Sequence, residues 1–221
     1  GSSARVFGSS AFNGAINIVT KREKRTGARL SAEGGSFGTW GVNGRVSVAT
    51  GAVTNSVSGG YRQSDGGTLH SDFKRRQMFY QGDLASQHID LQWQVGLSSQ
   101  DFGANTFYSA KFNDQFEATR RYLTSLSGTI KPFDTDWLTL VPQLYWHRDY
   151  DHYQLIRGKE GAAAGENYHR TDVYGGGMTA NLRWLLGTTS VGADIRREHI
   201  VSTAYGDELS EDEWINISGS D

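Results

Sequence analysis

The sequence predicts an all-β chain in which about nine antiparallel strands form a segment of a transmembrane β-barrel. Polar and apolar residues alternate with a period of two in segments from Ala28 to about Thr203. The connections between these segments alternate between short and long. The composition is polar, with a mean hydropathy of −0.53, 12% aromatic residues and 28 Gly among 221 residues. This composition is typical of barrels, because half of each strand faces water.

The alternation is clearest in three segments, 40–49, 89–97 and 176–184. In the second of them the apolar positions are Ile89, Leu91, Trp93, Val95 and Leu97. Weaker alternation occurs in 28–36, 54–63, 77–85, 122–131, 138–149 and 189–198. An antiparallel sheet with one dry face and one wet face has this pattern. Pro142 cannot donate a ladder hydrogen bond, so the strand that contains it is expected to be interrupted or bulged.

Loop lengths and aromatic positions both favour a membrane barrel. The short connections are 51–53, 86–88, 132–134 and 186–188, and those between them become long, at 65–75, 102–119 and 151–169. Outer-membrane barrels have short periplasmic turns and long external loops. The predicted strands are close to the roughly 9–11 residues that a tilted strand needs to cross a bilayer. Aromatic residues gather near strand ends, as interfacial girdles do; these are Trp40, Phe79, Tyr80, Trp137, Trp146 and Trp184.

Several other classes are disfavoured or excluded. A soluble sandwich or lectin-like domain is the alternative, but it has little reason to sort loops by length. The charges nearly cancel, with 22 Lys+Arg against 24 Asp+Glu and a net charge of −2, which argues against a nucleic-acid partner. The absence of Cys excludes disulfides and thiolate sites. No apolar run approaches the roughly 18 residues of a spanning helix.

Nine strands do not close a barrel. The two open edges would be very costly in lipid, and single-chain bacterial barrels have even strand counts. The sequence is therefore expected to be a piece of a larger barrel. Its N-terminus lacks a signal-peptide pattern, so the chain is expected to begin partway along a gene product or after a removed leader.

The first 23 residues carry a family resemblance. The segment SSARVFGSSAFNGAINIVTKRE, and within it Gly14, Ala15, Ile16, Asn17 and Ile18, resembles the end of the plug domain of TonB-dependent outer-membrane receptors. Segments 102–120, 144–155 and 166–175 are similar to the vitamin B12 receptor subgroup. The resemblance implies that residues 1–24 are the C-terminal end of a plug and its linker. Residues 25–221 would then be the first part of a barrel of about 22 strands.

The resemblance also implies a function and partners. A receptor of this kind takes up a scarce nutrient across the outer membrane of a Gram-negative bacterium, and the subgroup points to a corrinoid such as vitamin B12. A periplasmic TonB-type protein supplies energy through an N-terminal segment that this chain lacks, and a surface lipoprotein is a further partner to expect. Ferric siderophore and glycan receptors are alternatives within the family. A passive porin or adhesin-like barrel without energy coupling is the alternative outside it.

The predicted long connection 102–119 carries the candidate ligand-binding residues. They are Phe102, Asn105, Phe107, Tyr108, Lys111 and Asn113. Aromatic platforms beside amides and charges suit a flat ligand with many polar groups. The alternative is that these aromatic residues only pack the loop against its neighbours.

No catalytic residues and no cofactor are predicted. The six His show no spacing that would place a Ser/His/Asp group together, so the chain is not expected to be an enzyme. The resemblance points to calcium, because related B12 receptors bind it through loop aspartates. Asp65 and Asp72 are weak candidates for that role, with a solvated loop as the alternative.

Overall fold

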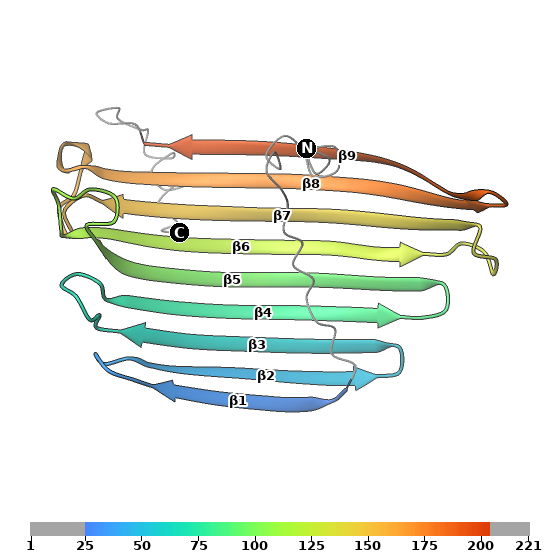
Figure 1. The fold of residues 1–221 in the computed structure, drawn as a ribbon, viewed down its shortest axis with the longest axis horizontal. Helices are drawn as coiled ribbons and strands as arrows, with labels where there is room; N and C mark the ends of the chain where they lie inside the picture. The colour runs from blue at the N-terminus through green and yellow to red at the C-terminus, as the bar shows by residue number, and fades with distance from the viewer. Residues whose placement is uncertain (1–24, 204–221) are drawn as a thin grey trace.

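The computed structural model describes residues 25–203, which form a single antiparallel sheet of nine strands (Figure 1). The strands lie side by side in chain order, so every neighbouring pair is a hairpin. Their bounds are β1 Gly27–Gly34, β2 Trp40–Thr50, β3 Val53–Ser64, β4 Phe73–Ala85, β5 Ile89–Asn105, β6 Gln115–Ile130, β7 Leu138–Gln154, β8 Glu166–Trp184 and β9 Gly187–Ser202. The predicted antiparallel sheet of about nine strands is confirmed, whereas Gly14–Ile18 lie outside the described residues.

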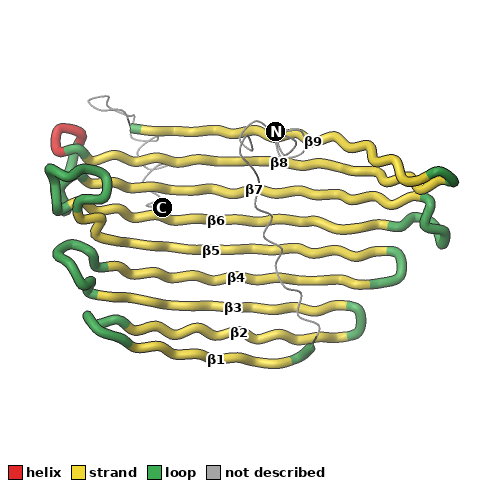
Figure 2. The backbone as a smooth tube through the Cα atoms, in the orientation of Figure 1, coloured by secondary structure: helices red, strands yellow, loops and turns green. Residues whose placement is uncertain are grey.

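Helical structure is nearly absent from residues 25–203. Figure 2 shows one short helical segment, the 3-10 turn η2 at Ala162–Ala164 in the β7–β8 connection. In this part of the chain no helix is long and apolar enough to cross a membrane.

The register divides the side chains between two unlike faces. Directly paired residues of antiparallel strands point to the same side. The row Gly82–Trp93–Leu126–Leu144–Gly176–Ile195, taken from β4 to β9, therefore lies on one side, which we call the apolar face. The opposite side carries Asp83, Gln92, Ser127, Gln143, Gly177 and Asp194, and we call it the polar face.

A broad band of the apolar face carries no charged side chain. From the short-connection end to Val42 on β2, Met78 on β4, Leu97 on β5 and Tyr122 on β6, every residue of this face is uncharged. We call this region the apolar band. It continues to Trp146 on β7, Tyr174 on β8 and Ile195 on β9. At the same levels the polar face carries Arg45, Asp83, Asp90, Arg183 and Asp194.

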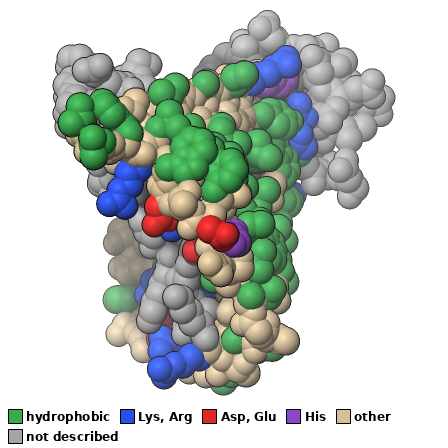
Figure 3. All heavy atoms as spheres, turned by 90° about the vertical axis from the view of Figure 1, so that its right-hand side faces the viewer, with side chains coloured by type: hydrophobic (Ala, Val, Ile, Leu, Met, Phe, Trp, Pro, Cys, Tyr) green, Lys and Arg blue, Asp and Glu red, His purple; other side chains and the backbone are tan. Residues whose placement is uncertain are grey.

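The apolar band is not covered by any second layer of the described residues. Leu30 is 83% exposed and Ile195 is 81% exposed. The buried apolar residues between 25 and 203 are only Ala104 and Val173. In Figure 3, hydrophobic side chains extend along one side of the sheet from top to bottom. The sheet therefore holds together through its hydrogen-bond ladders, and its apolar side chains face outward rather than into a protein core.

The strands are longer than the alternation predicts. β5 continues to Asn105 rather than ending near Leu97, and β8 begins at Glu166 rather than at Gly176. In these extensions both faces carry polar residues, so the alternation disappears although the ladder continues. The predicted loop 102–119 consequently shrinks to 106–114, and Phe102 and Asn105 belong to β5.

The ladder changes at Pro142, as expected from its missing N–H. Pro142 pairs with Met178 of β8, but between Ser127–Gln143 and Ile130–Leu140 the β6–β7 ladder contains no pairs. The register is the same on both sides of this gap, so it is an interruption rather than a bulge.

One of the aromatic residues expected in an interfacial girdle lies on the polar face. Phe79 pairs with Ser58 and Gly96, and therefore lies on the polar face rather than in an outward girdle. Trp40, Tyr80, Trp146 and Trp184 lie on the apolar face, whereas Trp137 is in the β6–β7 connection and stacks on Phe133 with ring centroids 5.1 Å apart. Alternation alone did not identify Phe79 because β4 has bulky residues at consecutive positions 78–80.

Candidate functional site

The two ends of the sheet differ in their connections. At one end the strands are joined by 51–52, 86–88, 131–137 and 185–186. At the other end, on the left of Figure 1, the connections 35–39, 65–72, 106–114 and 155–165 become longer along the chain. The predicted separation of short connections at one end from long connections at the other therefore holds, except that connection 131–137 is longer than connection 35–39. We call the left-hand end the loop end.

Loops 65–72 and 155–165 are joined by a bidentate ion pair between Arg157 and Asp72. Arg157 donates from both terminal nitrogens to Asp72, Nη1 to Oδ1 at 2.7 Å and Nη2 to Oδ2 at 3.0 Å. The Arg157 guanidinium also lies 4.6 Å from the centroid of the Phe116 ring. Its hydrogen bonds hold the pKa of the Asp72 carboxyl below its ordinary value. Two loops far apart in the sequence are thereby fixed to each other.

Loop 106–114 is bound to both of these loops. The backbone N–H of Arg157 donates to the carbonyl of Asp114 at 2.8 Å, and His70 Nδ1 lies 3.1 Å from Asp114 Oδ1. Loop 65–72 in turn accepts hydrogen bonds from the end of β5, Gly103 N to Asp72 O at 2.9 Å and Asn105 N to His70 O at 3.1 Å. The three loops form one connected platform above β4–β8.

Gln115 fixes the fold of loop 106–114 from beneath. Its side chain is 0% exposed. Its Nε2 donates to the carbonyls of Ser109 and Phe112, and its Oε1 accepts from the Tyr153 hydroxyl at 3.0 Å. These bonds satisfy the buried amide and hold the loop against β7.

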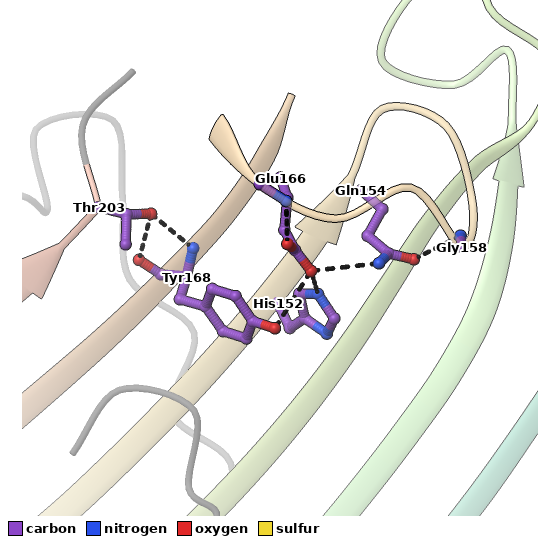
Figure 4. A network of polar contacts seen from close by, with 7 residues as sticks. His152, Gln154, Gly158, Glu166, Tyr168 and Thr203 are labelled. Carbon is purple, nitrogen blue, oxygen red and sulfur yellow. Dashed lines mark hydrogen bonds and ion pairs between the residues drawn. The ribbon is translucent and has the colours of Figure 1, made fainter. Parts of the chain in front are cut away.

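Glu166 closes loop 155–165 in the same manner (Figure 4). Its Oε1 lies 2.7 Å from His152 Nε2 and accepts from Gln154 and Tyr168, and its Oε2 accepts from the N–H of Gly161 at 2.6 Å. The His152 and Tyr168 rings stack with centroids 4.2 Å apart. The carboxylate is surrounded by donors from its own loop and the adjoining strands, so its role is to hold the loop base.

The platform presents aromatic side chains to solvent. Phe107 is 79% exposed, and its ring packs edge to face on Tyr108 at a centroid distance of 4.9 Å. Tyr108 in turn packs on Tyr153 at 5.4 Å, and its hydroxyl donates to the Glu117 carboxylate. Burial and the neighbouring Glu117 carboxyl raise the pKa of Tyr108, so this hydroxyl remains a donor at neutral pH.

A polar hollow of about 390 Å³ lies below this aromatic group. Its charged lining residues are Arg75, Glu117, Arg121, Asp149 and Asp151, and Gln100 and Thr119 add neutral polar groups. Arg121 forms an ion pair with Asp149 across the β6–β7 pair. Exposed rings above a hollow with both signs of charge can hold a flat ligand that carries several polar substituents.

The structure places the predicted ligand residues in two groups. Phe107, Tyr108, Lys111 and Asn113 lie in loop 106–114, whereas Phe102 pairs with Glu117 on the polar face of β5. Asn105 ends β5 after a register shift between Gly103 and Asn105, and it has a positive φ of 44°. The shift turns Asn105 toward the polar face, opposite Gln115.

The two calcium candidates make different contacts in loop 65–72. Asp72 is held by Arg157, and Asp65 lies at the end of β3, where its N–H donates to Phe37 O at 2.8 Å. Within residues 25–203 no group of three or more His, Asp or Glu side chains is placed to hold a metal ion.

The residues that organise the platform were not identified from the sequence. Arg157 acts through Asp72, 85 residues away, and Gln115 is bonded to Tyr153, 38 residues away, whereas the partners of Glu166 lie within 14 residues of it. No local motif indicates such pairings. The nearest signal is the position of Gln115 and Glu166 at the start of β6 and β8, directly after the loops that they close.

Comparisons with known proteins add no relative: no family model, curated protein or solved structure matches the chain.

The Asp72–Arg157 pair leads to a prediction about the platform. Asp72→Asn removes one charge, and we expect faster hydrogen exchange in both 65–72 and 155–165 of the full-length protein at pH 7. Because the folded pKa of Asp72 is lowered, its contribution is present above the unfolded-state pKa and is lost as the pH falls through the folded value. The wild type should therefore approach the exchange rates of the variant only in strong acid. Asp136→Asn, which breaks the Lys131 contact at the opposite end, is the control; equal effects of both changes on the loops would contradict the assignment.

Proposed function

We propose that this chain is part of the wall of an outer-membrane β-barrel, and that the barrel belongs to a TonB-dependent receptor for a scarce nutrient. The observation that carries the proposal is the apolar band, which runs uncharged across nine strands and is backed by a charged polar face. A barrel wall between lipid and an aqueous lumen requires this division of side chains.

The exposure of the band favours lipid over water. Soluble monomers rarely expose apolar patches beyond a few hundred Å². Here exposed apolar residues occur from Leu30 and Val46 on the first strands to Val191 and Ile195 on the last. A soluble sandwich would place a second sheet on this face, whereas in the described residues all nine strands belong to one sheet.

The charges on the apolar face begin where a bilayer would end. Toward the loop end, the next residue on this face after the last uncharged one is charged. The change is from Met78 to Arg76 on β4, from Tyr122 to Arg120 on β6 and from Tyr174 to Asp172 on β8. Charges are costly in the hydrocarbon centre and far less so at the interface. The strands therefore have a lipid-facing part and a part that stands in the aqueous phase and supports the loop platform.

The receptor assignment is supported by the loop platform and by the resemblance of 14–18 to a plug terminus. Aromatic rings on tied loops above a polar hollow suit recognition of a flat, polar nutrient, and a corrinoid has this character. A passive porin has no need of such a surface. Because the outer membrane has neither ATP nor an ion gradient, concentrative uptake would draw on a periplasmic TonB-type partner.

Uptake by the full-length gene is the direct test. The full-length gene is expressed in a Gram-negative host that lacks its own B12 receptor and requires the vitamin. TonB-dependent growth at nanomolar concentrations of the vitamin supports the proposal. Growth on a ferric siderophore or a glycan instead would identify a different nutrient but would still support a TonB-dependent receptor. Uptake independent of TonB would indicate a passive pore and contradict the receptor proposal.

The facing of β5 provides a test of membrane position. Trp93 lies on the apolar face over Gly82 and donates from Nε1 to the Tyr80 hydroxyl at 3.0 Å. We expect Trp93→Arg to lower the free energy of unfolding from bilayers by roughly 2–4 kcal/mol, because it places a charge against lipid. Its neighbour Gln92 faces Asp83, with Nε2 3.0 Å from Oδ1, so Gln92→Arg should be tolerated. Equal losses for the two variants of the full-length protein in urea titrations would contradict the facing of the sheet.

The exposed ring of Phe107 provides a test of the ligand surface. Phe107→Ala removes a side chain that packs only on its loop neighbour Tyr108 among the described aromatic pairs, so assembly should be unaffected. Loss of one aromatic contact of about 1 kcal/mol predicts roughly fivefold weaker nutrient binding. Phe133→Ala, an exposed aromatic at the opposite end, is the matched control. Unchanged affinity in equilibrium binding would remove loop 106–114 from the site.

A further inference from the structure

A groove of about 700 Å³ crosses the apolar face over β5–β9. Its apolar walls are Trp93, Leu126, Leu144, Trp146, Tyr174 and Ile195. Gly176 forms the floor, because it lies between Leu144 and Ile195 in the same row and has no side chain of its own. A Cβ at this position would stand 2.7 Å from Leu144 Cδ2, so the Leu144 side chain leans over the glycine from one wall of the groove.

The edge of the groove toward the loop end is positively charged. Arg197 lines the groove directly and pairs in register with Tyr174. One row higher, Asp172 is 2% exposed and receives hydrogen bonds from Arg148 Nε at 2.7 Å and Trp146 Nε1 at 3.3 Å. Arg170 Nε lies 3.3 Å from the second oxygen of Asp172. Two arginines, Arg148 and Arg170, therefore contact one carboxylate. With Arg197 one row below them, this edge has more positive than negative charge.

Arg197 differs from the residue beside it. Arg196 points to the polar face, where its Nη2 lies 2.5 Å from Glu198 Oε1. For Arg197 the part of the chain between 25 and 203 offers no acidic partner within ion-pair distance, and its side chain is exposed beside the groove. A guanidinium in this position is suited to phosphate, which it can bind through two parallel hydrogen bonds.

We propose that this groove binds one lipid molecule with an anionic phosphate headgroup. The acyl chain lies over Gly176 between the aromatic and aliphatic walls, and the phosphate contacts Arg197 at the edge nearest the loop end. The inference rests on the proposed position of the apolar face in a membrane. Charge complementarity selects the occupant: positive charge directly above an apolar groove matches a headgroup joined to a chain. A peptide would leave its backbone groups unpaired in the hydrocarbon region.

Native mass spectrometry of the full-length protein tests the proposal. The protein is extracted in detergent and supplied with phosphatidylglycerol, with phosphatidylcholine of the same acyl chains, or with inorganic phosphate alone. We expect one phosphatidylglycerol to remain bound at detergent concentrations that remove phosphatidylcholine. Arg197→Gln should weaken this binding about fivefold, as expected for one basic residue at a membrane surface. Arg196→Gln, the adjacent residue on the opposite face, should leave it unchanged.

A second variant and an insertion assay separate the outcomes. Gly176→Leu fills the floor of the groove and should also release the lipid. If this variant fails to fold, the comparison of Arg197→Gln with Arg196→Gln still tests the proposal. Equal retention of the two lipids, or equal effects of Arg196→Gln and Arg197→Gln, would overturn the proposal. Displacement of the lipid by inorganic phosphate alone would indicate an ion site. A lipid-free dimer would indicate that a second copy of the chain occupies the groove. Either result would also overturn the proposal. Quenching of Trp fluorescence by brominated lipids reports membrane insertion separately, so the lipid site can fail while the membrane position stands.

Discussion

The register of the antiparallel ladder is the constraint on which the rest of this molecule depends. Each strand pairs with its chain neighbours over most of its length, so the backbone polar groups of the interior strands are satisfied within the sheet. A shift of one residue in any pair would move charged residues such as Asp83 and Arg183 to the apolar face and apolar residues such as Leu91 to the polar face. In the proposed membrane position, the cost of either exchange explains why the pattern extends over nine strands without a charged residue in the apolar band.

The extension of the strands beyond the apolar band has a structural consequence. It raises the loop connections above the level at which the apolar face changes from uncharged to charged residues. The extended ends of β5–β8 also bring side chains from distant segments into contact, such as Arg157 with Asp72 and Tyr153 with Gln115. These contacts tie three loops into one surface. A ligand would therefore meet a largely preformed platform, which lowers the entropy cost of binding.

Glycine and aromatic residues are paired across the strands in a recurrent manner. The Trp93 ring occupies the space above Gly82, and the Tyr145 ring occupies that above Gly175, so a Cβ at either glycine would overlap the ring. The first pair lies on the apolar face and the second on the polar face. In a sheet with almost no buried apolar residues, such cross-strand contacts provide packing that a core provides elsewhere. At Gly176 the neighbouring side chain is Leu144 rather than a ring, and both residues line the groove on the apolar face.

The sequence by itself determined the class of the sheet, the order of its hairpins and the facing of most residues in the apolar band. These properties follow from a period of two and from turn chemistry, both of which are local. It also indicated the interruption at Pro142, because a missing N–H acts at its own position. It could not determine the parts of β5–β9 nearest the loop end, where both faces carry polar residues and the alternation disappears although hydrogen bonding continues.

Only the tertiary structure decided how the loop end is assembled. Phe107 and Tyr108 could be selected from the sequence as candidate ligand residues of a long connection. The shift that turns Asn105 toward the polar face and the closing roles of Gln115 and Glu166 could not be predicted. The physical reason is that these roles depend on which strands become neighbours and on the register between them. A hydrogen bond from Arg157 to Asp72 spans 85 residues of sequence but only 2.7 Å of space, and the sheet alone brings the two together.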